Sequence, residues 1–434
     1  MSCSAWAAVP SSPCAPSVAV GAGPSPEDTP RTVSSVDGDP AAAVTEVLRE
    51  VLEDRSDHAR SLDPRFAEHV AGTLADFALS GASRRRAALV WWGWRACGGG
   101  AQTVDRGAAR DTDRGAARDE ERPPGRAPGA EDGPGHVLRV AAALELIQCC
   151  ALIHDDLMDG SPRRRGGPAV HVRLAAGHED TDRPAAGVPP AGAPAPFGWS
   201  AAVLVGDLAL AWADDLLAET GLTGPTRAEV QALWREMRTE MVAGQYLDLA
   251  ARPADAGSGD DALGTAVLKS GSYSVERPLS LGAALAAAPP DTRRTLRSVG
   301  RAAGLAFQLR DDQLGVFGDT AVTGKPSGDD IRQGKATHLV ALALRRARRR
   351  GDRHALRVLG GALGNRELSP AGLDEVRAVL ADTGACAAVE QRIADLVAAC
   401  AVELRSARLD PAARDRLLDV LHAAAGGPVP RGPR

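Results

Sequence analysis

Residues 140–159 read VAAALELIQCCALIHDDLMD, and the fold class can be inferred from this stretch. Its apolar residues recur at intervals of three and four, which predicts a helix with a buried face. On such a helix Asp155 and Asp159 are four residues apart and face the same way, and Asp156 is turned by ~100° from Asp155. The sequence therefore predicts three carboxylates at the end of a buried helix.

The same helical pattern recurs along the chain. Apolar residues follow the three-and-four spacing at 204–217 and 389–404, and only four isoleucines occur, so alternating β-branched runs are absent. Side chains that cap helices predict helix starts at Thr226 (with Glu229 three residues later), at Ser369-Pro370 and at Asp410-Pro411. We therefore expect an all-α fold built as one large helical domain.

Three segments have compositions that do not support a packed core. Residues 1–40 are rich in Ser, Pro, Gly and Ala, residues 98–135 contain an imperfect DRGAARD repeat, and residues 176–196 contain five prolines. Such segments bury too little apolar area to offset the ~1–2 kcal/mol per residue that backbone ordering costs. We expect a disordered tail over 1–40, a domain over 41–425 with insertions at 98–135 and 176–196, and a flexible tail over 426–434.

Composition excludes several classes of protein. The chain has 434 residues with 51 basic and 56 acidic side chains, a net charge of −5, which argues against a nucleic-acid partner bound through a basic surface. No apolar run is seen that reaches the roughly 18–20 residues of a membrane span, and no signal peptide is recognisable. Seven scattered cysteines without a CxxC pair are typical of reduced thiols. We therefore expect a cytoplasmic protein without a membrane span.

The first acidic cluster has a specific chemical implication. Three like charges on one helical turn repel each other by a few tenths of a kcal/mol per pair, roughly, so they need compensation. Mg²⁺ prefers carboxylate oxygens and is often held by one or two carboxylates together with substrate phosphates. A solvated acidic turn is the alternative. The arginines at 163–165 follow closely, and they can either neutralise the carboxylates or bind phosphate oxygens.

A second acidic cluster follows a second apolar stretch. Asp311 and Asp312 are expected to close a helix, and a glycine-rich segment after them carries Asp319, Lys325, Asp329, Asp330 and Lys335. This composition suits a metal ion together with a polyanion, although an ordinary mixture of surface charges is also compatible with it. Two aspartate pairs, each after an apolar helix and each followed by cations, argue against coincidence.

At this point the motifs resemble those of a known family. The chain resembles the trans-isoprenyl diphosphate synthases, or polyprenyl synthetases, from about residue 41 to 422 outside the two insertions. The motifs agree in order and spacing: Asp155-Asp156-x-x-Asp159, Arg164-Arg165-Gly166-Gly167-Pro168, Gly206-Asp207, Gly244-Gln245 with Asp248, Lys269-Ser270, Gln308-x-x-Asp311-Asp312, and Gly324-Lys325 through Gly334-Lys335. The resemblance implies the class I isoprenoid synthase fold, a helical bundle around a central apolar cavity, and a homodimer.

The resemblance also assigns roles to residues. It implies that Asp155 and Asp159 hold Mg²⁺ from one wall and Asp311 from the other, with Asp156 and Asp312 in support and up to three ions per site. It implies contacts to the allylic diphosphate from Arg164, Lys269, Ser270, Gln308, Lys325 and Lys335. It implies contacts to isopentenyl diphosphate from Arg84 and Arg165.

The implied activity is Mg²⁺-dependent elongation of a prenyl chain with isopentenyl diphosphate. The small residues Cys150 and Ala151, just before the first motif, favour geranylgeranyl diphosphate (C20) as the product. Ser83, Gln148 and Gly315 depart from the family pattern, the first two in the half that binds isopentenyl diphosphate. Two alternatives therefore stay open: a terpene cyclase-like or other enzyme that ionises a prenyl diphosphate, and a non-catalytic partner subunit.

Overall fold

The three helices predicted from apolar spacing are present in the computed structural model. The structure describes residues 32–81, 83–100, 133–177, 196–250, 264, 267–318, 327–335 and 337–426. Residues 140–157, 204–217 and 389–404 lie in α6 (Pro134–Asp159), α8 (Phe197–Ala218) and α18 (Ala385–Ser406). The fold is all-α, as expected, and the only strands among the described residues are β1 (Arg163–Arg164) and β2 (Gly167–Pro168).

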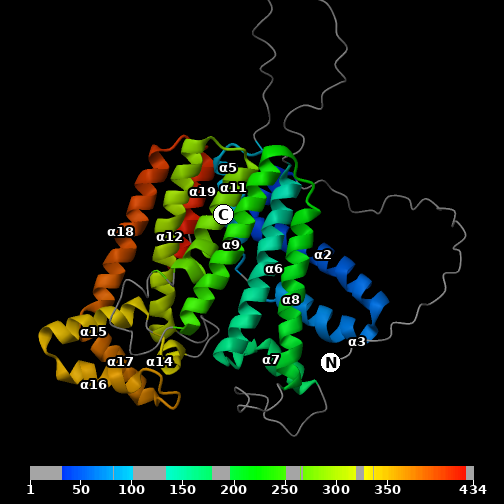
Figure 1. The fold of residues 1–434 in the computed structure, drawn as a ribbon. Helices are drawn as coiled ribbons and strands as arrows, with labels where there is room; N and C mark the ends of the chain where they lie inside the picture. The colour runs from blue at the N-terminus through cyan, green and yellow to red at the C-terminus, as the bar shows by residue number, and fades with distance from the viewer. Residues whose placement is uncertain are drawn as a thin grey trace, which may run out of the picture.

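The bundle is organised around long helices that run up and down the molecule (Figure 1). α6 packs against α8, α9 (Gly224–Ala250) packs against η3 (Val267–Glu276), and α12 (Pro290–Phe317) packs against both η3 and α18. The first part of the chain contributes α1 (Val33–Gly38), α2 (Pro40–Leu62), α3 (Pro64–Phe66), η1 (Ala67–Ala71), α4 (Gly72–Leu79) and α5 (Arg85–Ala96). The remaining elements are α7 (Val170–Ala176), α11 (Arg277–Leu285), α14 (Asp329–Gln333), α15 (His338–Arg350), α16 (Arg353–Ala362), α17 (Pro370–Asp382) and α19 (Pro411–Ala424).

Two apolar clusters form the core. The larger one joins α2, α5, α6, α8 and α11 and contains the fully buried Trp91 and Trp94, whose rings lie 5.0 Å apart. The smaller one joins α12 to α15–α18 through side chains such as Leu359 and Leu380. Burying a side chain of this size contributes about 1.5–3 kcal/mol, so both clusters hold the helices that carry the acidic motifs.

Two of the three predicted helix starts are confirmed. The Ser369 hydroxyl accepts a hydrogen bond from Gly372 N, and the Asp410 carboxylate accepts one from Ala413 N, so each caps the helix that begins at the following proline. The prediction at Thr226 is wrong by three residues, because a helix capped by Thr226 would begin at Arg227, whereas α9 begins at Gly224.

The N-terminal tail ends earlier than expected, so its prediction is wrong for residues 32–40. Thr32 caps α1, Val36 is buried, and the Asp37 carboxylate accepts hydrogen bonds from Trp91 Nε1 at 2.9 Å and from Arg95. These contacts tie α1 to α5. The tails and insertions expected elsewhere fall mostly on residues 1–31, 101–132, 178–195 and 427–434, which lie outside the described residues.

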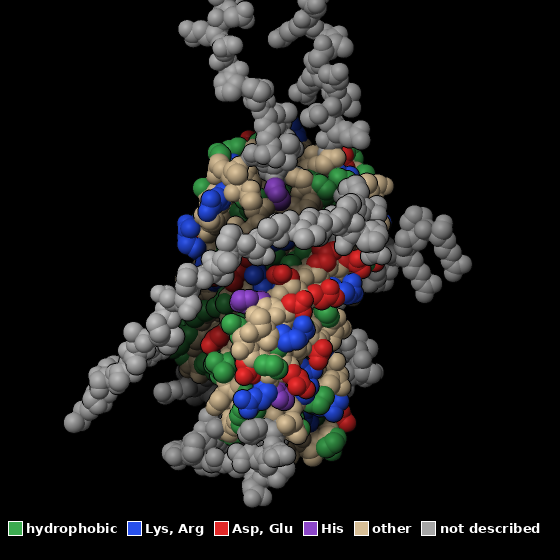
Figure 2. Space-filling view, turned by 90° about the vertical axis from the view of Figure 1, so that its right-hand side faces the viewer, with side chains coloured by type: hydrophobic (Ala, Val, Ile, Leu, Met, Phe, Trp, Pro, Cys, Tyr) green, Lys and Arg blue, Asp and Glu red, His purple; other side chains and the backbone are tan. Residues whose placement is uncertain are grey.

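α6 also differs from expectation in its length. Its 26 residues include an 18-residue window with a mean hydropathy of 1.7, so by length and composition the helix could cross a membrane, contrary to the expectation that no apolar run is long enough. However, 78% of that window is buried inside the bundle, which is the environment of a core helix. On the side of the bundle that Figure 2 shows, acidic and basic side chains are interspersed.

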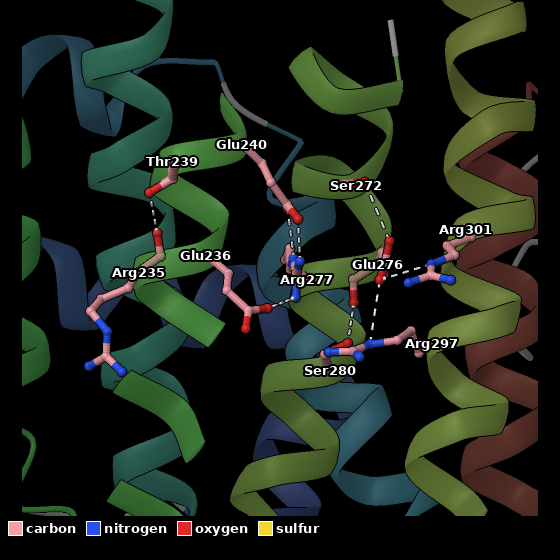
Figure 3. Close-up of polar contacts among 10 residues, drawn as sticks. All are labelled: Arg235, Glu236, Thr239, Glu240, Ser272, Glu276, Arg277, Ser280, Arg297 and Arg301. Carbon is pink, nitrogen blue, oxygen red and sulfur yellow. Dashed lines mark hydrogen bonds and ion pairs between the residues drawn. The ribbon is translucent and has the colours of Figure 1, made fainter. Parts of the chain in front are cut away.

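An ionic network centred on two buried residues, Glu276 and Arg277, joins α9, η3, α11 and α12 (Figure 3). Glu276 is 3% exposed and lies 3.3 Å from Arg301 Nε and 3.6 Å from Arg297 Nε, whereas the neighbouring Arg277 reaches Glu236 and Glu240 on α9. Because the two adjacent residues point to opposite sides, they fix the junction of η3 and α11 between two long helices.

Glycines bring η3 and α12 into close contact. A Cβ atom on Gly304 would lie 2.4 Å from the carbonyl oxygen of Gly271, so a side chain there would force the helices apart. This approach places the backbone of Lys269 and Ser270, which is part of η3, beside the helix that carries the second acidic motif.

Candidate active site

The first acidic wall lies at the end of α6. Asp155, Asp156 and Asp159 occupy its last turns, and Gly160 ends the helix with a left-handed conformation (φ 64°). The Asp155 and Asp159 side chains are 14% and 11% exposed, and Asp156 is buried. The pair on one face of a helix that the sequence predicted is therefore confirmed.

A tight hairpin returns a cation to this wall. Arg165 (φ 54°) and Gly166 (φ 79°) form the two-residue turn between β1 and β2, with the positive φ angles that such hairpins require. The turn directs Arg164 back onto α6, where Nε donates to Asp156 Oδ1 at 2.8 Å and a terminal nitrogen donates to Asp155 Oδ2 at 3.1 Å. In this structure Arg164 neutralises the carboxylates, which was one of the two functions expected for it.

The second acidic wall lies within α12 rather than at its end, because the helix continues to Phe317. Asp311 is exposed, whereas Asp312 is buried and accepts hydrogen bonds from Gln308 Nε2 at 2.8 Å and His338 N at 3.3 Å. Burial, aided by the charges of Asp330 and Asp311, raises the pKa of Asp312 to about 8 in spite of these hydrogen bonds. Asp311 is thus open to ligands, whereas Asp312 is enclosed.

Lys335 connects the two walls. It follows α14, which packs against α12, and its Nζ lies 2.8 Å from Asp159 Oδ2 on α6. Burial disfavours the ammonium form, but the charges of Asp159, Asp330, Asp155 and Asp248 outweigh this and raise the pKa of Lys335 above its ordinary value. The ammonium group of Lys335 therefore lies in the electrostatic field of carboxylates from α6, α9 and α14.

The donor set fits Mg²⁺ that is shared with a diphosphate. In the described part of the chain, no three His, Cys, Asp or Glu side chains form a group that could hold a metal by themselves. Mg²⁺ commonly takes one or two carboxylates and completes its shell with phosphate oxygens and water. Asp155 and Asp159 on one face of α6, with Asp311 exposed on α12, supply such carboxylates, and the cations beside them would balance a diphosphate.

The substrate contact expected for Arg84 stays a prediction, and in this structure Arg84 has buried protein partners. Its side chain is 3% exposed, its NH1 lies 2.9 Å from the buried carboxylate of Glu145, and its NH2 donates to the carbonyl oxygen of Ala78 at 2.6 Å. A left-handed backbone (φ 48°) at the start of α5 turns the guanidinium inward. Arg84 is therefore part of a buried structural ion pair.

Arg165 lies over the loop that follows α4. Its NH1 donates to the carbonyl oxygens of Phe77 and Ser80 at 2.5 and 2.9 Å, and its guanidinium stacks 4.5 Å from the centre of the Phe77 ring. Its role toward isopentenyl diphosphate stays a prediction.

Lys325 lies outside the described residues, as do the side chains of Lys269 and Ser270, so their roles stay predictions too.

Two residues near the walls were missed as site residues. Arg85 is exposed at the start of α5, and its pKa is lowered by partial desolvation and by Arg86, against the opposing charge of Asp311. Asp330 acts electrostatically on both Asp312 and Lys335. In the sequence, the three consecutive arginines at 84–86 were the available signal for Arg85. The glycine at position 315 was the available signal for Asp330.

Two surface pockets lie away from this site. One, of about 230 Å³, is lined by residues of α9, α11 and α12 that include Glu229, Ser280 and Arg297. The other, of about 370 Å³, lies beside α16 and α17. The central apolar cavity implied by the resemblance stays a prediction.

The chain is similar in sequence to several known proteins. A family model described as polyprenyl synthetase matches residues 126–368. A geranylfarnesyl diphosphate synthase of Aeropyrum pernix is 30% identical over 267 residues, which cover 61% of this chain and 74% of that protein. A geranylgeranyl diphosphate synthase of Mycobacterium tuberculosis is 34% identical over 212 residues, which cover 48% of this chain and only 53% of that protein.

A solved structure extends the likeness over most of the chain. The geranylgeranyl pyrophosphate synthase of Corynebacterium glutamicum, complexed with isoprenyl diphosphate and magnesium, superposes with a TM-score of 0.73 at 33% identity and covers 88% of this chain and 98% of that one. Other relatives of similar identity are named farnesyl diphosphate synthases, so product length differs among the relatives.

Proposed function

The chain belongs to the polyprenyl synthetase family of prenyltransferases, and from that membership we propose that it condenses isopentenyl diphosphate with an allylic diphosphate to give all-trans geranylgeranyl diphosphate (C20). The observation that carries the proposal is the contact between Lys335 and Asp159. It brings the segment after the second acidic motif to 2.8 Å from the first motif, which is the arrangement needed to enclose one diphosphate.

The roles of the residues follow from charge. Asp155, Asp159 and Asp311 would hold Mg²⁺, which when bound stabilises the negative charge that develops on a leaving diphosphate. Arg164 and Lys335 contact carboxylates in this structure. We propose that they exchange these partners for phosphate oxygens when the metal neutralises the carboxylates. Arg164 can then bind in a bidentate fashion and Lys335 as a point charge.

Product length is the finer part of the proposal. Cys150 is 4% exposed and Ala151 is partly buried, both on α6 one turn before Asp155. Small side chains here leave room for a chain longer than farnesyl, which supports C20.

The departures at Ser83 and Gln148 favour one competing proposal. Ser83 is exposed and carries no charge, and Gln148 Oε1 is buried without a hydrogen-bond partner among the described residues, so the residues expected for isopentenyl diphosphate are altered. A cyclase-like enzyme that ionises a prenyl diphosphate would tolerate both changes. A non-catalytic partner subunit would not need two intact acidic walls.

One experiment separates these proposals. The purified chain is incubated with Mg²⁺, labelled isopentenyl diphosphate and, in turn, dimethylallyl, geranyl and farnesyl diphosphate, and the products are analysed by chromatography. We expect C20 diphosphate from each primer and no terpene when isopentenyl diphosphate is omitted. Hydrocarbon or alcohol products without isopentenyl diphosphate would support the cyclase, and no turnover in any mixture would support the partner subunit.

A homodimer and a cytoplasmic location are also part of the proposal. Val203 and Leu204 on α8 are 44% and 57% exposed, which supports contact with a second copy through this helix. Light scattering of the purified chain tests the dimer: a monomeric mass at micromolar concentration would contradict it.

A further inference from the structure

The two acidic motifs differ at one position. In the first, carboxylates stand four residues apart at Asp155 and Asp159, on the same face of α6. In the second, the residue four positions after Asp311 is Gly315, which has no side chain. The second wall therefore lacks a carboxylate where the first wall has one.

The space beside Gly315 is filled by another residue. A Cβ atom built on Gly315 would lie 2.1 Å from Asp330 Oδ2 and 3.0 Å from Asp330 Cγ. The Asp330 carboxylate thus lies where a side chain of residue 315 would begin. This contact comes from α14, 15 residues further along the chain, and not from α12 itself.

Backbone hydrogen bonds fix Asp330 in this place. Gly328 N donates to the carbonyl oxygen of Gly315 at 2.8 Å, which fastens the start of α14 to α12 at the residue without a side chain. Lys335 N donates to the carbonyl oxygen of Asp330 at 2.9 Å, which closes the other end of α14. The segment from 328 to 335 therefore delivers a carboxylate and an ammonium group together.

Asp330 is linked to both sides of the site. Its carboxylate lies against Gly315 in the second wall, and its backbone carbonyl holds Lys335, whose Nζ lies 2.8 Å from Asp159 in the first wall. Asp330 therefore lies beside the second wall and next to the segment that joins the walls.

We propose that Asp330 replaces the carboxylate missing at Gly315, so that the second acidic wall is assembled from α12 and α14, and that it positions Lys335 and the Mg²⁺–diphosphate between the walls. The inference rests on the proposed function, because it assigns a residue to that same site. It also explains why residue 315 is glycine: any larger side chain would displace the carboxylate of Asp330.

The test measures binding and not turnover. Inorganic pyrophosphate is titrated into the full chain by calorimetry at several Mg²⁺ concentrations. Asp330→Asn keeps the shape and removes the charge, and Asp329→Asn is the matched control, because Asp329 Oδ2 accepts a hydrogen bond from Gln333 Nε2 at 3.1 Å within α14. We expect Asp330→Asn to weaken pyrophosphate binding about tenfold or more, as loss of a supporting carboxylate does at metal sites, and Asp329→Asn to leave it within about twofold.

A second experiment moves the carboxylate from residue 330 to residue 315 and tests whether Asp330 acts by supplying a charge at that place. Gly315→Ala should weaken binding as Asp330→Asn does, because the added methyl group displaces the same carboxylate. The double variant Gly315→Asp with Asp330→Ala should recover most of the affinity, since the charge returns to the wall from α12. Equal binding by wild type and Asp330→Asn would overturn this inference and leave the proposed function intact. Absence of Mg²⁺-dependent binding by the wild type would overturn the proposed function itself.

Discussion

The Nζ atom of Lys335 lies 2.8 Å from Oδ2 of Asp159, although 176 residues separate the two in the chain. This contact spans the site from the segment after α12 to the end of α6. Asp159 is 11% exposed and Lys335 is 23% exposed, so the pair is partly shielded from water and stronger than a surface ion pair. If a diphosphate entered here with Mg²⁺, the ion would replace Lys335 as the partner of Asp159. The phosphate oxygens would replace Asp159 as the partner of Lys335, and each new contact would be stronger.

Replacing Lys335 by Met should therefore weaken binding of the allylic substrate. A hydrogen bond to a charged group contributes about 1.5–3 kcal/mol, so we expect the KM for the allylic diphosphate to rise about tenfold or more. Steady-state kinetics at saturating isopentenyl diphosphate provide the measurement. Lys335→Arg is the control that keeps the charge, and an unchanged KM in Lys335→Met would show that the ammonium does not contact substrate.

Arg84 and Arg85 should behave differently although they are neighbours. Arg84→Met leaves Glu145 buried without its partner, which should lower the free energy of unfolding by about 3–5 kcal/mol in urea denaturation. Arg85→Met removes an exposed charge near Asp311, and we expect a stability change within about 0.5 kcal/mol and a loss of activity. If Arg84→Met kept full stability and raised only the KM for isopentenyl diphosphate, Arg84 would be a substrate residue after all.

The ionic network of Figure 3 predicts a difference between two glutamates. Glu276 is 3% exposed between Arg297 and Arg301, whereas Glu236 is 55% exposed beside Arg277. We expect Glu276→Gln to lower the free energy of unfolding by about 1–3 kcal/mol and Glu236→Gln by less than about 1 kcal/mol. Thermal unfolding of both variants tests this, and equal shifts in Tm would show that burial does not distinguish the two sites.

Ala151→Phe should shorten the product. An aromatic ring one turn before Asp155 would occupy the space into which a growing chain extends, so we expect farnesyl diphosphate to accumulate in place of the C20 product. Cys150→Ala, which makes the neighbouring residue smaller, should not shorten it. Chromatography of the dephosphorylated products distinguishes the two, and an unchanged product from Ala151→Phe would place the end of the cavity elsewhere.

The helix that carries the first motif was predictable because its determinants are local. Three-and-four spacing fixes which side chains of α6 are buried, and it places Asp155 and Asp159 on one face without any tertiary information. The caps at Ser369 and Asp410 were predictable for the same reason, since a side chain and an amide three residues later are enough to define them.

Contacts between distant segments were not predictable in this way. The inward turn of Arg84 depends on a left-handed backbone that a non-glycine residue seldom adopts, so its buried contact with Glu145 could not be predicted. The place of Asp330 beside Gly315 depends on how α14 docks against α12, and nothing in the spacing of the residues reveals that approach. α1 could not be predicted either, because it is held by contacts of Asp37 with α5, 54 and 58 residues away.

The most direct test of the central claim, that two acidic walls grip one diphosphate, compares wild type with Asp155→Ala and Asp311→Ala. Formation of prenyl diphosphate from labelled isopentenyl diphosphate and farnesyl diphosphate is measured with saturating Mg²⁺, after circular dichroism has confirmed that the variants are folded. We expect each single variant to lose activity by at least about 10²–10³-fold, because the two walls act on the same developing charge. Turnover at the wild-type rate by either folded variant would contradict the account.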